Sequence, residues 1–335
     1  WGPDDKLYYS IGDQGANQFS NRCNFIKAQV LPTQEEIDAE DYQNYPGKTL
    51  RINIDGSIPD DNPVFNGVRS HIYTIGHRNH QGMVFSSDGK LYNAEHGPKS
   101  DDEVNLIEAG KNYGWPRVAG FKDGNAYEYC VWASAENCPE TNFSDYTCPE
   151  TADVFQESSF EDPDFVPPLF TYFTVPDSYD FQSSCGFICW PTIAPSSVKI
   201  YEHETLDWLT NSLLVVSLKK GTVYQAKLSE DGLSIEGDTV ELWNTINRYR
   251  DIAVNPNGRI FYIITDNGGS TRSADGSGST SNLQNRGTII KVEYPDINPL
   301  VQDTVFNVDE GLPNGSPVGK VASSGVIDSY EIISG

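Results

Sequence analysis

The chain has 335 residues with a hydrophobic fraction of 37%, which is enough to bury a sizeable core as one large domain or two smaller ones. Its formal net charge of −25 argues against nucleic acid and anionic membrane surfaces as partners, and we attribute most of the acidity to solubility or adaptation to a salty medium. No apolar run reaches about 18 residues, so we expect no membrane span. The 18 Tyr, 15 Phe, 29 Gly and 20 Pro favour many short strands joined by turns over helices.

One hairpin pattern occurs three times, in residues 1–13, 84–92 and 254–262. Each copy has a tight turn of the Asp-Gly or Asn-Gly type, then a cation, then a strand with alternating aromatic residues. Recurring hairpins in an all-β chain predict a β-propeller. The strand before the turn is cut off at Trp1 in the first copy, so we expect an incomplete propeller that lacks its N-terminal blade or blades.

Other elements follow from local signals in the sequence. Thr33, with Glu36 three residues later, predicts the N-terminus of a short helix at 33–37. We expect further strands over residues 49–54, 71–76, 212–217, 222–228 and 288–294.

Two long segments carry few periodic runs. Residues 124–184 are interpreted as an irregular insertion, which is either a functional lid or interface or else disordered. The Gly- and Ser-rich residues 267–285 are most simply a flexible surface excursion.

The pattern of the sequence changes after Tyr294, where new alternating segments begin. We assign residues 1–296 to the propeller. Residues 297–335 contain alternating segments and are interpreted as a linker and the first strands of a cadherin-like β-sandwich module, with a disordered tail as the alternative.

Six cysteines occur, at positions 23, 130, 138, 148, 185 and 189. Four lie in loop-like sequence where disulfides are plausible in an oxidising compartment, and Cys185 could pair with Cys189. A zinc site is disfavoured because no histidine lies at ligand spacing from any cysteine pair.

The stretch 89–123 combines Gly97-Pro98 with the acidic triplet Asp101, Asp102 and Glu103. Backbone carbonyls beside carboxylates are the ligands that calcium prefers. The stretch therefore indicates either a calcium site or a solvated acidic loop, and no EF-hand pattern decides between them.

Eight motifs occur in order and together carry a resemblance to a family. They are IGDQGANQ (11–18), LRINIDGSIP (50–59), SHIYTIGHRN (70–79), GPKSDDEVNLI (97–107), NYGWP (112–116), ICWPT (188–192), SLKKG (217–221) and NRYRD (247–251). From Trp1 to about Tyr294 the chain closely resembles the soluble quinoprotein glucose dehydrogenases, which use pyrroloquinoline quinone (PQQ). The resemblance implies a six-bladed propeller with PQQ over the central channel and calcium (Ca²⁺) beside it.

The resemblance also implies which residues bind the cofactor. PQQ carries three carboxylates, and Arg78, Lys219, Arg248 and Arg250 match the cations that bind it in the family. Further cofactor positions are Asn79, Thr192 and Phe187. Phe187 stands where family members have Tyr, and the loop between Cys185 and Cys189 is shorter than usual, so the sugar specificity is open. Read without the resemblance, each Arg is a plain salt-bridge partner.

The metal positions follow from the same resemblance. Gly97 and Pro98 match the backbone ligands of the active-site calcium, which acts as a Lewis acid. The positions that match structural calcium sites, several through backbone oxygens, are Glu103, Tyr113, Ala119, Phe121, Asp123 and Glu157.

The implied reaction is oxidation of an aldose at C1 to the lactone by hydride transfer to PQQ. The family's histidine base would precede Trp1, so we expect this chain by itself to be inactive. Asp13 matches the carboxylate that orients the base, Gln18 and Trp190 match sugar contacts, and Arg78 should stabilise charge on the reducing quinone. The histidines that are present are interpreted as structural or surface residues: His71, His77, His80, His96 and His203.

Two other classes of function compete with the dehydrogenase. One is a non-catalytic carbohydrate-binding or adhesion propeller of a secreted surface protein, and the other is a calcium-dependent hydrolase on a propeller. The set of four cations favours the enzyme, because neither alternative needs it. We expect a periplasmic or extracellular protein with an unidentified electron acceptor, and the family's tendency suggests a homodimer.

Overall fold

The computed structural model describes residues 1–182, 185–295, 300–301 and 323–324. The chain divides into two compact units, Trp1–Val292 and Glu293–Gly335. In the second unit, β21 (Leu300–Val301) pairs in antiparallel fashion with β22 (Ser323–Ser324). The rest of the predicted cadherin-like module lies outside the described residues.

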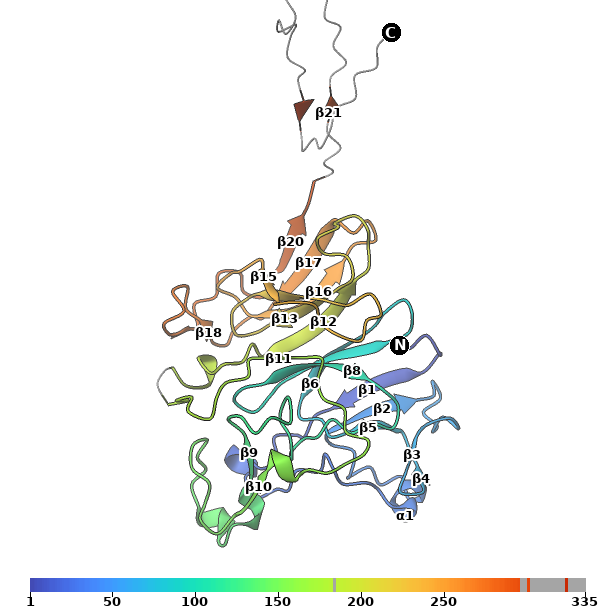
Figure 1. Ribbon diagram of the computed structural model, residues 1–335, viewed down its shortest axis with the longest axis vertical. Coiled ribbons are helices and arrows are strands. Elements are labelled where there is room, and N and C mark those ends of the chain that lie inside the picture. Colours follow the sequence, from blue (N-terminus) through green and yellow to red (C-terminus); the bar gives the residue numbers. More distant parts are fainter. Residues whose placement is uncertain (183–184, 296–299, 302–322, 325–335) are drawn as a thin grey trace, which may run out of the picture. The chain divides into compact units, whose positions relative to one another are not determined.

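Four sheets of three or four strands make up most of the described part of the first unit (Figure 1). The first sheet contains β1 (Leu7–Ile11), β2 (Lys48–Ile52) and β5 (Ile72–Ile75). The second contains β6 (His80–Phe85), β7 (Leu91–Glu95), β8 (Asp102–Ile107) and β11 (Phe170–Tyr172). The third contains β12 (Pro195–Tyr201), β13 (Ser212–Ser217), β14 (Val223–Lys227) and β15 (Val240–Leu242). The fourth contains β16 (Tyr249–Val254), β17 (Ile260–Thr265) and β20 (Ile289–Glu293).

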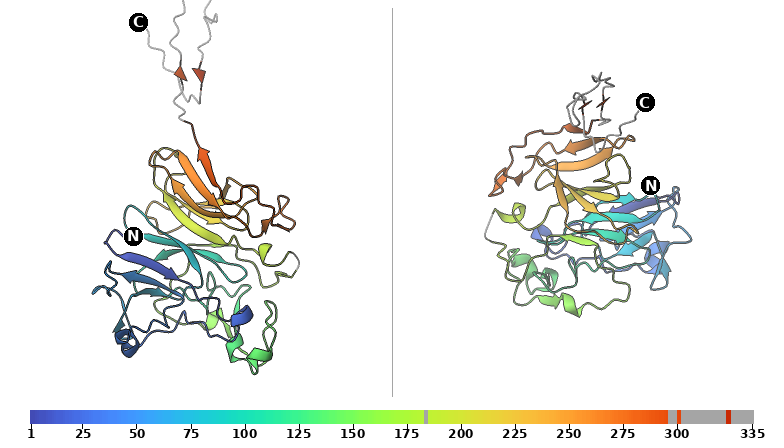
Figure 2. Two further views of the ribbon diagram at one scale, coloured as in Figure 1. Left: turned by 180° about the vertical axis from the view of Figure 1, so that it is seen from behind. Right: turned by 45° about the horizontal axis from the view of Figure 1, so that its top comes forward.

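The sheets follow one another around the unit in chain order, as Figure 2 shows from two further sides. The strand β12 packs against both β6 and β16, and β6 also contacts β1. Sheets of consecutive strands that pack side by side through their first strands are the blades of a propeller. The prediction of an all-β propeller is therefore confirmed.

The second and third copies of the repeated hairpin are the β6–β7 and β16–β17 hairpins. Their turns contain Gly89 and Gly258, which both have positive φ angles and so suit residues without a side chain. The first copy enters β1 through a turn in which the N–H of Gly2 donates to the carbonyl of Lys6 at 2.8 Å. The alternating aromatic pattern thus marks the strands that follow each turn.

A large core cluster lies between the second and third sheets. It includes Tyr92, Val104, Val198 and Leu213. Every residue of β13 is buried, because this strand has a neighbouring sheet on each face. The packing of adjacent blades, rather than one central core, therefore holds the described unit together.

The predicted helix is α1 (Gln34–Asp38). Its capping box is confirmed, since the Thr33 hydroxyl accepts from the N–H of Glu36 at 3.2 Å and the Glu36 carboxylate accepts from the N–H of Thr33 at 2.8 Å. None of the helices in the described residues is long and apolar enough to cross a membrane. The short elements that remain are η1 (Phe19–Asn21), β3 (Val64–Phe65), β4 (Val68–Arg69), β9 (Glu128–Val131), η2 (Trp132–Ser134), η3 (Cys138–Glu140), β10 (Asp153–Gln156), η4 (Glu157–Ser159), η5 (Gly186–Ile188), β18 (Thr271–Arg272) and β19 (Ser279–Thr280).

Disulfides hold the insertion 124–184 in place. The pairs are Cys23–Cys138, Cys130–Cys148 and Cys185–Cys189, so all six cysteines are used and the pairing of Cys185 with Cys189 is confirmed. The described part of the insertion is irregular, as expected, apart from the β9–β10 hairpin, three single turns and β11, which joins the second sheet. A bond that spans 115 positions ties it to the segment that carries Gln18.

Replacing Cys23 and Cys138 together with Ser should lower the free energy of unfolding by about 2–5 kcal/mol, because the unfolded chain regains the entropy of a long loop. The matched double variant at Cys130 and Cys148 opens a bridge of only 18 positions and should cost about 1–2 kcal/mol less. Urea unfolding without reductant measures both changes. Equal losses would contradict the chain-entropy explanation.

Candidate functional site

A cleft of about 570 Å³ opens between the loops of the second, third and fourth sheets. Nine of the sequence-predicted site residues line it: Gln18, Arg78, Gly97, Pro98, Phe187, Trp190, Thr192, Lys219 and Arg248. Apart from the loop of Gln18, which follows β1, the loops that carry them either precede the first strand of a sheet or follow its second strand. In an antiparallel sheet of consecutive strands these loops lie at the same end, so the fold gathers residues that are far apart in sequence.

Two cations in the cleft have no carboxylate partner within 4.0 Å among the described residues: Arg78 and Lys219. The Lys219 ammonium donates to the carbonyl of Trp190 at 3.1 Å and to the hydroxyl of Thr192. Burial lowers the pKa of Lys219 to about 7, although the nearby Asp102 carboxylate favours the charged form. The guanidinium of Arg78 lies over the Trp115 ring, 5.5 Å from its centroid. Both cations are therefore available to an anion that enters the cleft.

The other two predicted cations share one carboxylate, that of Asp266. Arg248 lines the cleft and donates to Asp266 at 3.0 Å and to the carbonyl of Ser270 at 2.7 Å. Arg250 donates to both oxygens of Asp266, at 2.9 and 2.8 Å. Its side chain is 44% exposed, and it is not among the residues that line the cleft. The structure therefore brings three of the four predicted cations to the cleft.

The cleft also contains Asp102, a residue to which the sequence assigned no role of its own. Its carboxylate accepts from the N–H groups of Gly97 at 2.8 Å, Ile193 at 2.6 Å and Ala194 at 2.7 Å. Asp102 is 1% exposed, and burial raises its pKa to about 6. One side chain thus joins the Gly97-Pro98 loop to the segment that follows Thr192.

Gly97 allows the tight turn that this arrangement needs. A side chain there would collide with the backbone oxygens of Ser100 and Asp101, so only Gly lets the loop fold back on itself. His96, expected to be structural or on the surface, lines the cleft next to this turn. Its Nε2 lies 2.7 Å from the carbonyl of Pro195, and burial together with the charge of Arg78 lowers its pKa to about 4, so the ring is neutral.

Asp13 and Asn79 lie on a smaller adjoining hollow that shares Gln18 and Arg78 with the cleft. The Asp13 carboxylate accepts from the indole N–H of Trp115 at 3.0 Å and from the N–H of Gly15 at 2.9 Å. Burial raises the pKa of Asp13, and the charge of Arg78 opposes this rise. The buried Asp13 carboxylate therefore lies on a hollow that adjoins the cleft.

The aromatic wall of the cleft comes from the disulfide-closed loop 185–190. Phe187 is 64% exposed, whereas Trp190 is buried and donates through its Nε1 to the carbonyl of Phe181 at 3.1 Å. Arg272 fixes this loop through three backbone contacts. It donates to the carbonyls of Ile188 at 3.3 Å, Cys189 at 3.1 Å and Trp190 at 3.2 Å.

The segment 267–285 is therefore not a free surface excursion. Its β18 strand carries Arg272 to the cleft wall, and the neighbouring Thr271 is fully buried. A single Arg in a Gly- and Ser-rich loop gave no sequence signal for this role.

Behind the cleft, three carboxylates lie against the loop 119–124 and a fourth belongs to the loop itself. They belong to Asp101, Glu103, Asp123 and Glu157, and the pKa values of the buried ones are raised by burial and by each other's charge. The pKa of Glu103 rises to about 8, that of Glu157 to about 7 and that of Asp101 to about 6. A group of carboxylates that repel one another in this way could hold a hard cation.

The hydrogen bonds of this acidic group leave part of its acceptor capacity unused. Glu103 accepts from the N–H of Gly120 at 2.7 Å, and Glu157 accepts from the N–H groups of Ala119 and Gly124, both at 2.9 Å. The Oδ2 atom of Asp101 is buried without a hydrogen-bond partner in the described part of the chain.

The remaining predicted metal positions are arranged differently. Asp123 and Phe121 are exposed on the loop, and the Asp123 carboxylate accepts from the N–H of Asn125 at 2.8 Å. Tyr113 is buried, and its hydroxyl donates to the carbonyl of Leu106 at 2.5 Å, so only its backbone could serve as a ligand.

The fold and the cleft together define a propeller with a cleft at one end of its blades that is lined by Arg78, Lys219 and Arg248. The family model described as "Glucose / Sorbosone dehydrogenase" matches residues 1–147 and 178–272, and the chain belongs to this family. The chain is 46% identical over 301 residues to quinoprotein glucose dehydrogenase B of Acinetobacter calcoaceticus, covering 88% of this chain and 63% of the relative. It is 27% identical over 231 residues to aldose sugar dehydrogenase YliI of Escherichia coli K12, covering 68% of this chain and 50% of the relative.

A solved structure supports the fold. A putative oxidoreductase (glucose dehydrogenase) of Thermus thermophilus superposes with a TM-score of 0.50 at 23% identity, covering 87% of this chain and 62% of that one. The chain thus spans about half to two thirds of the length of the curated relatives it matches.

Proposed function

We propose that this chain forms the cofactor- and sugar-binding site of a quinoprotein that oxidises an aldose at C1 to the lactone, with PQQ as cofactor and calcium beside it. The observation that carries the proposal is the convergence of Arg78, Lys219 and Arg248 on one cleft. Arg78 and Lys219 have no carboxylate partner among the described residues, and shielding cations from water in this way is costly unless an anion completes the site. A cofactor with three carboxylates fits these three cations.

The residues in the cleft fit both ligands. Arg78, Lys219 and Arg248 would bind the carboxylates of PQQ, with Thr192 and Asn79 as polar contacts. The carbonyls of Gly97 and Pro98 would hold the calcium ion. When bound, PQQ supplies the hydride acceptor and calcium polarises it.

The sugar would lie against Trp190, with Gln18 as a hydrogen-bonding partner, and the exposed Phe187 would contact the cofactor. Aromatic faces and an amide are typical partners for a sugar ring. In the described part of the chain, the Asp13 carboxylate accepts from Trp115 and Gly15 and from no histidine. We infer that the chain binds cofactor and sugar but lacks the base that removes the C1 hydroxyl proton.

The experiment is a titration of the chain with PQQ in the presence of Ca²⁺, followed by addition of glucose. We expect the cofactor absorbance to report saturable binding, little bleaching with glucose alone, and faster bleaching when imidazole is supplied as a diffusible base. Bleaching that needs no imidazole would contradict the missing base. Absence of PQQ binding would overturn the dehydrogenase and favour the carbohydrate-binding propeller.

The acidic group behind the cleft is proposed as the structural calcium site. Ca²⁺ should raise the melting temperature, and chelation should lower it. The raised pKa values of about 8 for Glu103 and about 7 for Glu157 mean that Ca²⁺ must displace protons below pH 8. The rise caused by Ca²⁺ should therefore be larger at pH 8.5 than at pH 6, as thermal unfolding measures.

The variant Glu157→Gln should lose most of this stabilisation, whereas Glu108→Gln, on the surface, should keep it. A stabilisation by Ca²⁺ that does not depend on pH would contradict the role of these carboxylates.

We also propose a periplasmic or extracellular location, which three disulfides support because such bonds persist in oxidising compartments. The homodimer and the identity of the electron acceptor stay predictions.

A further inference from the structure

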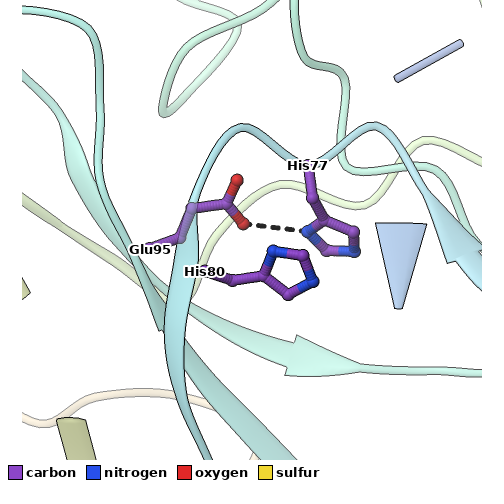
Figure 3. A group of neighbouring side chains, drawn as sticks. All are labelled: His77, His80 and Glu95. Atoms are coloured by element: carbon purple, nitrogen blue, oxygen red, sulfur yellow. Dashed lines mark hydrogen bonds and ion pairs between the residues drawn. The ribbon is translucent and has the colours of Figure 1, made fainter. Parts of the chain in front are cut away.

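A fully buried polar cluster, shown in Figure 3, is hydrogen-bonded to the backbone of Arg78 and Asn79. It consists of His77, His80 and Glu95, which are 0%, 3% and 2% exposed. The Nδ1 atom of His77 donates to Oε2 of Glu95 at 2.8 Å. None of the three residues has a part in the site described above.

The cluster has the composition of a metal site, but its geometry is that of a hydrogen-bonded group. One potential ligand atom from each residue lies within 4.8 Å of the others. The two imidazole rings, however, are stacked at 21° with centroids 4.4 Å apart. A metal bound through an imidazole nitrogen lies in the plane of that ring, and two stacked rings cannot share such a point. The stacking therefore disfavours a shared ion.

The stacking instead fixes the direction of one hydrogen bond. His77 lies between His80 on one face and Tyr113 on the other, with the Tyr113 centroid at 4.7 Å. Its Nε2 atom is 2.8 Å from the hydroxyl of Thr74. The imidazole cannot turn without losing these contacts, so its Nδ1 stays directed at Glu95.

The other carboxylate oxygen of Glu95 binds the backbone of the loop that contains Arg78 and Asn79. Oε1 accepts from the N–H of Arg78, in a short hydrogen bond, and from the N–H of Asn79 at 3.3 Å. The carbonyls of the same two residues accept from the N–H of Asp13 at 2.7 Å and of His96 at 3.1 Å. Every backbone polar group of Arg78 and Asn79 is thus bound, and Glu95 supplies the acceptor for both N–H groups.

We propose that Glu95 is a positioning residue that orients Arg78 and Asn79 toward the cofactor, with His77 holding the Glu95 carboxylate in place. Glu95 is the last residue of β7, two positions before Gly97, so the same strand end also sets the start of the Gly97-Pro98 loop. This inference rests on the proposed function, because it takes Arg78 and Asn79 to be cofactor ligands. The proposal predicts that Glu95 affects the affinity for PQQ although it does not contact the cofactor.

The first test needs neither cofactor nor variant. Hydrogen exchange of the wild-type chain should show slow exchange of the Arg78 and Asn79 amides, although both lie in a loop. In Glu95→Gln, the side chain keeps one acceptor oxygen for two sets of donors, and protection of these amides should fall by about tenfold or more. The matched control is Glu202→Gln, whose carboxylate likewise accepts from a turn N–H, that of Ser87, at 3.0 Å on an exposed surface.

The second test measures PQQ binding in the presence of Ca²⁺. Glu95→Gln should raise the Kd about 10- to 100-fold, and Glu202→Gln should leave it unchanged. In an Arg78→Ala background, Glu95→Gln should add little further loss, because Glu95 acts through Arg78.

Four results would overturn the proposal. They are fast exchange of the wild-type Arg78 amide, unchanged exchange in Glu95→Gln, fully additive effects of Glu95→Gln and Arg78→Ala, and a tightly bound stoichiometric metal that Glu95→Gln removes. If the wild type protects these amides but binds no PQQ, the proposed function fails and the backbone role of Glu95 stands.

Discussion

Replacing Asp102 with Asn should lower the free energy of unfolding by about 2–4 kcal/mol and strongly weaken PQQ binding. The Asp102 carboxylate accepts three backbone N–H groups from two loops, while an amide has one acceptor and one donor end. In either orientation of the Asn side chain, its NH₂ group faces at least one N–H donor. The Gly97-Pro98 loop and the Thr192 segment would then separate, and the cleft would lose its shape.

Urea unfolding and PQQ titration in the presence of Ca²⁺ measure the two effects. The control is Asp231→Asn, because the Asp231 carboxylate also accepts a backbone N–H, that of Leu233 at 3.1 Å, but in an exposed turn. It should change stability by less than about 0.5 kcal/mol. An Asp102→Asn protein as stable as the wild type would show that the two loops do not depend on this side chain.

PQQ affinity should fall as the pH rises above about 7, by up to about tenfold per pH unit. Burial lowers the pKa of Lys219 to about 7, so the free protein loses this ammonium above neutral pH. A bound carboxylate favours the charged form and raises the pKa again. Binding above pH 7 is therefore coupled to uptake of a proton by Lys219. The free energy needed to protonate Lys219 makes the binding free energy less favourable.

The measurement is the Kd of PQQ from pH 6 to pH 9. Lys219→Met should bind weakly and lose most of the pH dependence above 7. Lys220→Met is the matched control, because Lys220 is the adjacent residue, is 41% exposed and pairs with Glu241. The same pH profile in wild type and Lys219→Met would assign the dependence to another group.

Local signals in the sequence predicted the elements well. Turns with Gly at positive φ, such as those at Gly89 and Gly258, and the capping box of Thr33 with Glu36 depend on neighbours within a few residues. Strand edges moved by one or two residues, because the last ladder hydrogen bonds depend on the partner strand. The expected strand at 49–54, for example, is β2, Lys48–Ile52.

The sequence identified most of the residues that line the cleft, but not the residues that hold its loops in place. Arg78 and Lys219 belong to motifs that match the family, whereas Asp102, Arg272 and Glu95 act by binding backbone groups of distant loops. No pattern in the sequence marks a side chain whose partners are main-chain atoms about 80 or 90 positions away, as for Arg272 and Asp102. Such contacts exist only once the sheets have packed.

Arg250 lies outside the cleft, but its pairing with the Asp266 carboxylate connects it to the cleft residue Arg248. In the proposed site, an anion bound by Arg248 would compete with Asp266 for that guanidinium, and a weakened pair would leave a negative charge beside the ligand. Arg250 donates hydrogen bonds to both oxygens of that carboxylate. In the proposed site, Arg250 would therefore neutralise Asp266 and reduce its repulsion of the ligand.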